Sequence, residues 1–63
     1  MKNKIKKLRI QHGITQRELF EKTGVKILTI SNYERQLNTI PPDMAVKLAK
    51  AFNLNWWEIY EEE

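Results

Sequence analysis

Apolar residues in this chain recur at intervals of three and four positions, the spacing of helices that bury one face. Gly, Pro and Asn residues divide the pattern into five short segments. The first runs from about Lys2 to Gln11, with Ile5 and Leu8 as its apolar face and a His-Gly pair as its stop signal. No segment has the alternation of a strand, so the pattern predicts an all-α protein.

The second and third segments are separated by a short break. Thr15 with Glu18 three positions later is typical of a capping box, so a helix is predicted to begin there and to run to about Thr23. Gly24 then ends it. The third segment covers about residues 26–35, and its inward residues are Ile30 and Tyr33.

The last two segments are recognised by how they begin. Pro42 suits the first turn of a helix, where no backbone donor is needed. Asn55, with Glu58 three positions on, predicts the start of a short C-terminal helix over about residues 55–61. The fourth segment has a nearly continuous apolar side, formed by Met44, Val46, Leu48, Ala49 and Phe52. In the last segment Trp56, Ile59 and Tyr60 form one apolar stripe along the helix, of the kind that more often packs in the core than at an interface, and Trp57 lies off this stripe.

Length and composition restrict the class of protein. Sixty-three residues suffice for one domain, residues 1–63, with a small core. The absence of cysteine excludes disulfides and Cys-based zinc sites. The single histidine, His12, suits a helix C-terminus better than a metal site or a nucleophilic relay. We therefore expect no enzyme activity, no metal, no cofactor and no small-molecule ligand.

The distribution of charge and apolar residues indicates the partner. No apolar run approaches the roughly 18 residues of a membrane span, and the N-terminus lacks the apolar region of a signal peptide, which predicts a cytoplasmic protein without a membrane partner. Residues 1–35 carry nine Lys and Arg against three Glu, a net charge of +6, whereas residues 36–63 have a net charge of −3. The basic half is the part of the chain suited to a polyanion.

Two short helices joined through Gly24 and Val25 in the basic half have the layout of a helix-turn-helix, whose second helix enters a major groove of DNA. The stretches IKKLRIQHGITQRELFEKTGV, TISNYER and PPDMAVKLAKAFNL resemble the phage-repressor family of helix-turn-helix DNA-binding proteins, Cro-like or xenobiotic-response-element-like, over about residues 4–60. The resemblance implies a compact five-helix domain of lambda-repressor-like architecture, with the motif at about residues 16–35. It also implies an ion pair between Arg9 and Glu34, and a buried arginine needs such a partner.

The resemblance and the helix positions assign roles to the surface residues. The residues expected at DNA phosphates are Gln16, Arg17, Arg35, Asn38 and Thr39, and those expected at base edges are Lys26, Ile27, Leu28, Thr29 and Asn32. Gln16 follows the cap of the second helix, where free backbone N–H groups and the helix dipole favour a phosphate. Asn32 is the best candidate for reading a base, because its amide can pair with N6 and N7 of adenine.

Ile27 and Leu28 need a further explanation, because two neighbouring apolar side chains on an exposed face require a cover or a partner. In one interpretation they contact thymine methyl groups. In a second, one of them folds against Phe20, which stands where the family usually has a small residue. In a third, this surface binds a protein. The sequence leaves all three open.

The aromatic C-terminus bears on assembly. The resemblance implies that the last helix contributes to a two-fold dimer, which places the third helix of each subunit in one of two successive major grooves, about 34 Å apart. We expect Trp57 and the outer edges of Trp56 and Tyr60 at such a homodimer interface. The alternative is a monomer in which the aromatic residues cover the core.

The leading hypothesis is a dimeric protein that binds double-stranded DNA in a sequence-specific manner and acts as a small transcriptional repressor or regulator. The alternative hypothesis is a protein-interaction module on the same fold, antitoxin-like or an antagonist of a regulator. It would use the apolar surface of the third helix or Trp57.

Overall fold

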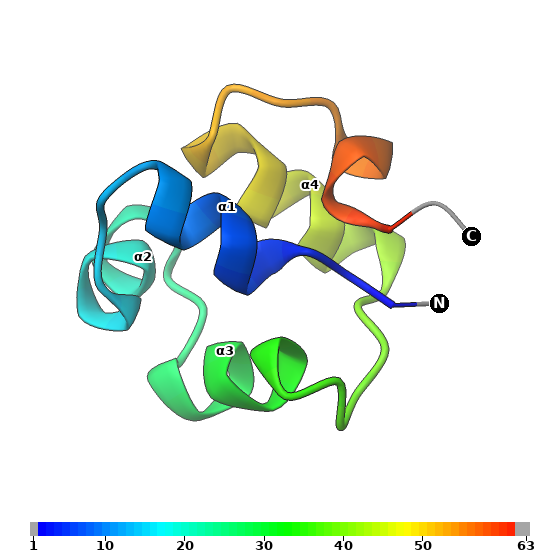
Figure 1. The fold of residues 1–63 in the computed structure, drawn as a ribbon, viewed down its shortest axis with the longest axis horizontal. Helices are drawn as coiled ribbons and strands as arrows, with labels where there is room; N and C mark the ends of the chain where they lie inside the picture. The colour runs from blue at the N-terminus through cyan, green and yellow to red at the C-terminus, as the bar shows by residue number, and fades with distance from the viewer. Residues whose placement is uncertain (1, 62–63) are drawn as a thin grey trace.

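The computed structural model describes residues 2–61 (Figure 1). It contains four α-helices, α1 (Ile5–Gln11), α2 (Gln16–Thr23), α3 (Ile27–Glu34) and α4 (Pro42–Ala51), followed by the 3-10 helix η1 (Trp56–Ile59). Within residues 2–61 no strand is present beyond a single antiparallel bridge between Asn3 and Tyr60. The all-α prediction is therefore confirmed for this part of the chain. None of these helices is long and apolar enough to cross a membrane.

The core lies where the helices converge, and every helix contributes to it. The fully buried large side chains are Ile5, Leu19, Ile30, Ile40, Leu48 and Ile59. Ile40 comes from the loop between α3 and α4, so this loop is held against the core just before α4 begins. Each such side chain stabilises the fold by about 1.5–3 kcal/mol relative to an exposed position. This burial is the main force that orients α3 against the other helices.

Local signals set the ends of α2. The capping box is confirmed, because Thr15 Oγ1 accepts the backbone N–H of Glu18 at 3.0 Å and the Glu18 carboxylate accepts that of Thr15 at 3.0 Å. The helix ends at Gly24, whose φ of 77° lies in the left-handed region that glycine tolerates best. Lys26 is the N-cap of α3 and makes no side-chain cap hydrogen bond. The short turn between the two helices places α3 directly beside α2.

The first and last helices are shorter than the sequence led us to expect. Helix α1 begins at Ile5 instead of near Lys2. The C-terminal helix expected over 55–61 is the four-residue 3-10 helix η1, so residues 2–61 contain four α-helices instead of five. The reason is a long-range pairing of extended backbone. The N–H of Lys4 donates to the carbonyl of Ile59 at 2.8 Å, and the N–H of Glu61 donates to that of Lys2 at 2.9 Å. These bonds hold both ends of the described chain side by side (Figure 1).

The apolar side of α4 also differs from the expected one by a single residue. Leu48, Ala49 and Phe52 are buried and Met44 is half-buried, but Val46 is exposed and Ala45 takes the buried place. Positions 45, 48, 49 and 52 follow the helical repeat of 3.6 residues, whereas position 46 falls about 100° away from position 45.

Candidate nucleic-acid interface

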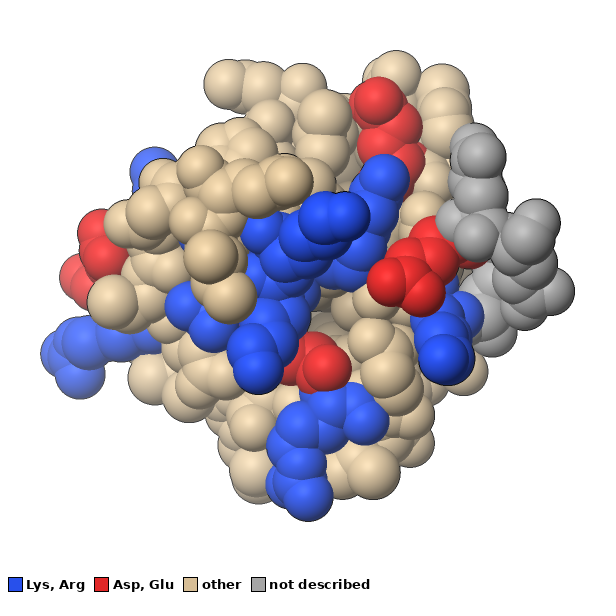
Figure 2. Space-filling view, in the orientation of Figure 1, with Lys and Arg blue, Asp and Glu red and all other residues tan. Residues whose placement is uncertain are grey.

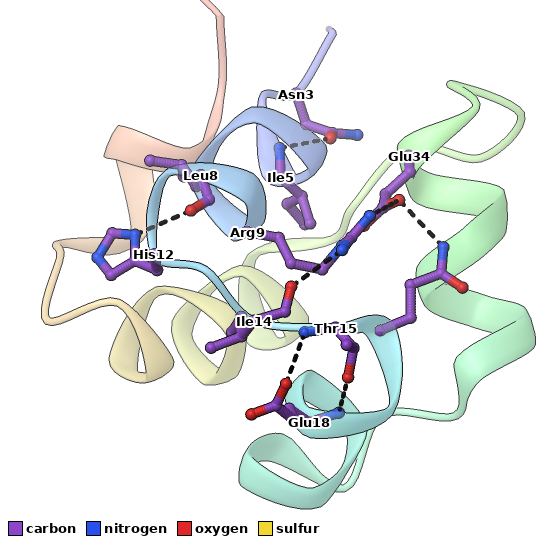
Figure 3. Close-up of polar contacts among 10 residues, drawn as sticks. Asn3, Ile5, Leu8, Arg9, His12, Ile14, Thr15, Glu18 and Glu34 are labelled. Atoms are coloured by element: carbon purple, nitrogen blue, oxygen red, sulfur yellow. Dashed lines mark hydrogen bonds and ion pairs between the residues drawn. The ribbon is translucent and has the colours of Figure 1, made fainter.

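A network centred on Glu34 connects α1, α2 and α3 (Figure 3). Arg9 Nε donates to Glu34 Oε2 at 2.7 Å, and Arg9 Nη2 donates to Glu34 Oε1 at 3.2 Å, so the ion pair is bidentate. Gln16 Nε2 donates to the same Oε1 at 3.0 Å. A third guanidinium nitrogen, Nη1 of Arg9, donates to the carbonyl of Ile14 at 3.0 Å, in the turn that leads into α2.

Burial makes this pair strong and costly to break. The side chains of Arg9 and Glu34 are only 15% and 4% exposed. The hydrogen bonds to the Glu34 carboxylate raise the pKa of Arg9 above its ordinary value, against the opposing effect of burial. The arginine therefore stays charged at every pH at which the protein is folded. It fixes the C-terminal end of α3 to α1 and the start of α2.

The side chains expected at phosphates come from two places on the surface. Gln16 and Arg17 occupy the first turn of α2, and the other three, Arg35, Asn38 and Thr39, lie at and beyond the C-terminal end of α3. All are exposed except Gln16, which is half-buried because its amide binds Glu34. Arg17 makes only a long contact of 3.9 Å to Glu21, four residues further along the exposed side of α2, so its charge remains accessible. Gln16 lies beside the C-terminal end of α3, because its amide binds Glu34, and Arg35, Asn38 and Thr39 follow that end in the chain.

The side chains expected at base edges lie on the outer face of α3. Lys26, Ile27 and Leu28 are exposed and Thr29 and Asn32 are half-buried, whereas Ile30 and Tyr33 face the core. Leu28 is 73% exposed, so no other part of residues 2–61 covers it. Packing against Phe20 therefore does not account for Leu28. Ile27 and Phe20 are each 39% exposed and are partly covered.

The aromatic residues of the C-terminal segment form an edge-to-face cluster at the surface. The rings of Trp56 and Trp57 are 5.8 Å apart between centroids, and those of Trp56 and Tyr60 are 6.2 Å apart. Ile59 is buried, but both tryptophans are exposed, so Trp56 is not the core residue that its place in the stripe suggested. The Tyr60 hydroxyl donates to the carbonyl of Ile40. Burial, and to a smaller extent the charge of the nearby Tyr33, raise the pKa of Tyr60 above 10.0.

A second link to the end of α3 was missed by the sequence reasoning. Gln36 has a φ of 60°, in the left-handed region, and its side-chain amide pairs with the backbone of Asn3, accepting the N–H at 3.1 Å and donating to the carbonyl at 3.0 Å. The Asn3 side chain in turn donates to the carbonyl of Tyr33 at 2.9 Å and accepts the N–H of Ile5 at 3.1 Å. No local pattern indicates this pairing, because the partners are 33 positions apart.

Taken together, the fold and this surface define a helix-turn-helix protein: α2 and α3 are joined through the Gly24 turn, and α3 presents an exposed outer face, with further exposed polar side chains at the start of α2 and after α3. Comparison with known proteins agrees. Residues 5–56 match the family model described as helix-turn-helix. The chain is 35% identical over 65 aligned positions to a protein of Bacillus subtilis (strain 168) named as an uncharacterized HTH-type transcriptional regulator, YgzD, and the alignment covers 100% of this chain and 98% of that protein. The chain belongs to the Cro-like helix-turn-helix family of DNA-binding proteins.

Proposed function

We propose that this protein binds double-stranded DNA in a sequence-specific manner as a small transcriptional repressor, with α3 in the major groove. The observation that supports the proposal is an α3 whose outer face is exposed and whose C-terminal end is fixed by the Arg9–Glu34 pair, with exposed cationic and amide side chains at the start of α2 and just beyond α3. A helix held in this way meets the groove in one orientation, which direct reading of bases requires.

Phosphate contacts hold the protein in register on the DNA and carry no sequence information directly. Arg17 at the start of α2 and Arg35 after α3 provide the charged contacts, and Gln16, Asn38 and Thr39 add hydrogen bonds. The amide of Gln16 is already oriented by Glu34 through a hydrogen bond of 3.0 Å. Gln16 is the first residue of α2, where the helix dipole favours an anion.

Base reading falls to five residues of the outer face, namely Lys26, Ile27, Leu28, Thr29 and Asn32. Asn32 suits adenine and Lys26 suits guanine or a phosphate. The 73% exposure of Leu28 favours a thymine methyl group as its partner, because an apolar side chain left in water gains by entering a groove beside an apolar atom. We therefore expect a site that contains A·T pairs opposite the first turn of α3.

A homodimer is the second part of the proposal. The exposed pair Trp56 and Trp57, with the edge of Tyr60, offers the large aromatic surface that is enriched at protein interfaces. A two-fold dimer through this end of the molecule would present two α3 helices to successive major grooves about 34 Å apart. The operator would then be a pseudo-palindrome with that half-site spacing.

The deciding experiment selects bound sites from a random DNA pool and then measures affinity as a function of salt. If Arg17 and Arg35 neutralise four phosphates in a dimer, the affinity should fall by roughly 100-fold between 50 and 200 mM salt. Arg35→Ala should weaken every sequence alike, whereas Asn32→Ala should relax selection at about one base pair and cost about 1–3 kcal/mol at the cognate site. A flat salt response, or equal losses for both variants on every sequence, would refute the assignment.

A protein-binding role for the exposed Leu28 is the competing function. Leu28→Ala distinguishes the two. In the DNA mechanism this variant loses its preference for T·A over C·G at one position and keeps its salt dependence. If α3 instead docks on a protein, the wild-type chain selects no sequence from the pool, and a stoichiometric partner is released by Leu28→Ala but not by Asn32→Ala.

A further inference from the structure

A shallow basic cavity lies on α1, outside the surface assigned to base reading. Its volume is about 450 Å³. Lys4, Lys6 and Lys7 line it from the N-terminal part of the chain, and Glu34 and Gln36 line it from the end of α3. Figure 2 shows Lys and Arg side chains gathered over α1 around a hollow in this face of the molecule. The function proposed above makes no use of these lysines.

The positive charge of the cavity is available to a ligand. Within residues 2–61, carboxylates lie within 4.0 Å of a cationic group only in the pairs Arg9 with Glu34 and Arg17 with Glu21, so the three cavity lysines are unpaired there. The carboxylate of Glu34 is neutralised by Arg9 and is almost completely buried. Glu61 is the remaining acidic residue at the edge, so three positive charges face one negative charge.

The cavity is continuous with the proposed DNA surface. Gln36 lines it and directly follows Arg35, the phosphate anchor at the end of α3. Its hydrogen bonds to Asn3 hold this junction in place at 3.0 and 3.1 Å. A DNA strand presents a further phosphate for about every 3.4 Å along the duplex axis, so a strand held at Arg35 has neighbouring phosphates within reach of this junction. Ile10, 61% exposed, adds an apolar floor beside which the lysine stems can lie.

We propose that the α1 lysine cavity, formed by Lys4, Lys6 and Lys7, binds phosphates of the DNA backbone next to those held by Arg35. The inference rests on the proposed function and extends its footprint from the helix-turn-helix to α1. An acidic protein surface has matching charge, but the continuity with Arg35 favours DNA. The cavity contributes affinity on any sequence, and α3 contributes the sequence preference.

The test compares two double variants of equal charge. Lys6→Gln with Lys7→Gln changes the cavity, and Lys47→Gln with Lys50→Gln changes two exposed lysines of α4, which takes no part in the proposed surface. All four positions are exposed and lie in helices, where Gln and Lys have similar propensity, so both variants should keep the wild-type melting temperature. The probe is a duplex carrying the site selected from the random pool, with affinity measured from 50 to 200 mM salt and phosphate contacts mapped by ethylation interference.

Loss of two phosphate contacts reduces the log-log salt slope by about 1.8 per bound subunit. Between 50 and 200 mM salt, the affinity of the cavity variant should therefore fall by a factor about 12-fold smaller per subunit than that of wild type. Some phosphates whose ethylation blocks wild-type binding should no longer block binding of the variant. The α4 variant should match wild type. Equal changes of the salt slope in both variants, or no change in either, would overturn the inference. The proposed function would still stand if wild type binds the selected duplex and Arg35→Ala weakens that binding. If wild type binds no duplex, the proposed function fails and the inference with it.

Discussion

Replacing Glu34 by Gln tests how much of the fold depends on the network between the three N-terminal helices. The substitution keeps the shape of the side chain and removes its charge. With the amide oxygen in the place of Oε1, the Arg9 guanidinium keeps its hydrogen bonds to the carbonyl of Ile14 at 3.0 Å and to that oxygen at 3.2 Å, and it loses the Nε bond at 2.7 Å together with the opposite charge. Gln16 can still donate to the new amide oxygen, so the variant changes mainly the ion pair.

The magnitude follows from burial. Removing one partner of a buried pair typically costs 3–5 kcal/mol. Arg9 is 15% exposed and retains two of its hydrogen bonds, so we expect a smaller loss of about 2–3 kcal/mol. A chain of this length has a total stability of only about 3–9 kcal/mol. The melting temperature should therefore fall by roughly 10–20 °C.

A double-mutant cycle separates the ion pair from packing. Urea unfolding is measured for wild type, Glu34→Gln, Arg9→Met and the double variant at neutral pH. The double variant should be less destabilised than the sum of the single variants by at least about 1 kcal/mol, because it leaves no unpaired buried charge. If Glu34→Gln costs less than about 0.5 kcal/mol, or if the two single losses add, the network does not hold α3 in the way proposed.

Three further predictions concern other links of the fold. Thr15→Ala removes the cap of α2 and should cost about 1 kcal/mol in urea unfolding, while Thr39→Ala in the exposed loop should change stability by less than about 0.5 kcal/mol. Gln36→Gly relieves a left-handed φ of 60° but breaks the pairing with Asn3, so the free energy of unfolding should fall by about 1 kcal/mol. A gain in stability would mean that backbone strain outweighs the pairing. Folding raises the pKa of Tyr60 above 10.0, so the protonated hydroxyl contributes stability that is fully present below pH 10 and is lost as the pH rises through the folded-state pKa. The melting temperature should therefore fall beyond pH 10, and it should fall less steeply in Tyr60→Phe.

The parts of the fold that sequence could predict are those with local causes. The capping box at Thr15 and Glu18 and the glycine at position 24 determine where α2 begins and ends from contacts within a few residues. The inward face of α3 followed from the helical repeat, and Ile30 and Tyr33 are buried. For the candidate site, the resemblance provided the residues but not their environment. It assigned Gln16 to a phosphate without indicating its bond to Glu34.

The parts that sequence could not predict depend on partners far apart in the chain. Residues 2–4 were expected to be helical because they precede Ile5 and Leu8, whose spacing is that of one helix face, without a break in the pattern. In the structure they are extended, because their backbone binds residues 59–61 on one side and the Gln36 amide on the other. The same pairing ends η1 at Ile59 and leaves Trp56 exposed. A helical propensity worth a few tenths of a kcal/mol per residue is outweighed by several hydrogen bonds of about 1 kcal/mol each.

These links together explain how an eight-residue helix can act as a fixed recognition element. An isolated helix as short as α3 is not stable in water, so its orientation depends on tertiary contacts. Its N-terminus is set by the Gly24 turn, and its C-terminus is held twice from the N-terminal segment, through Arg9 to Glu34 and through Asn3 to the carbonyl of Tyr33. Asn3 is not among the residues proposed to contact bases, yet its replacement should weaken DNA binding in proportion to the freedom it gives to α3. In the proposed mechanism, residues 3 and 9 therefore control the geometry of base reading as directly as the residues proposed to lie in the groove.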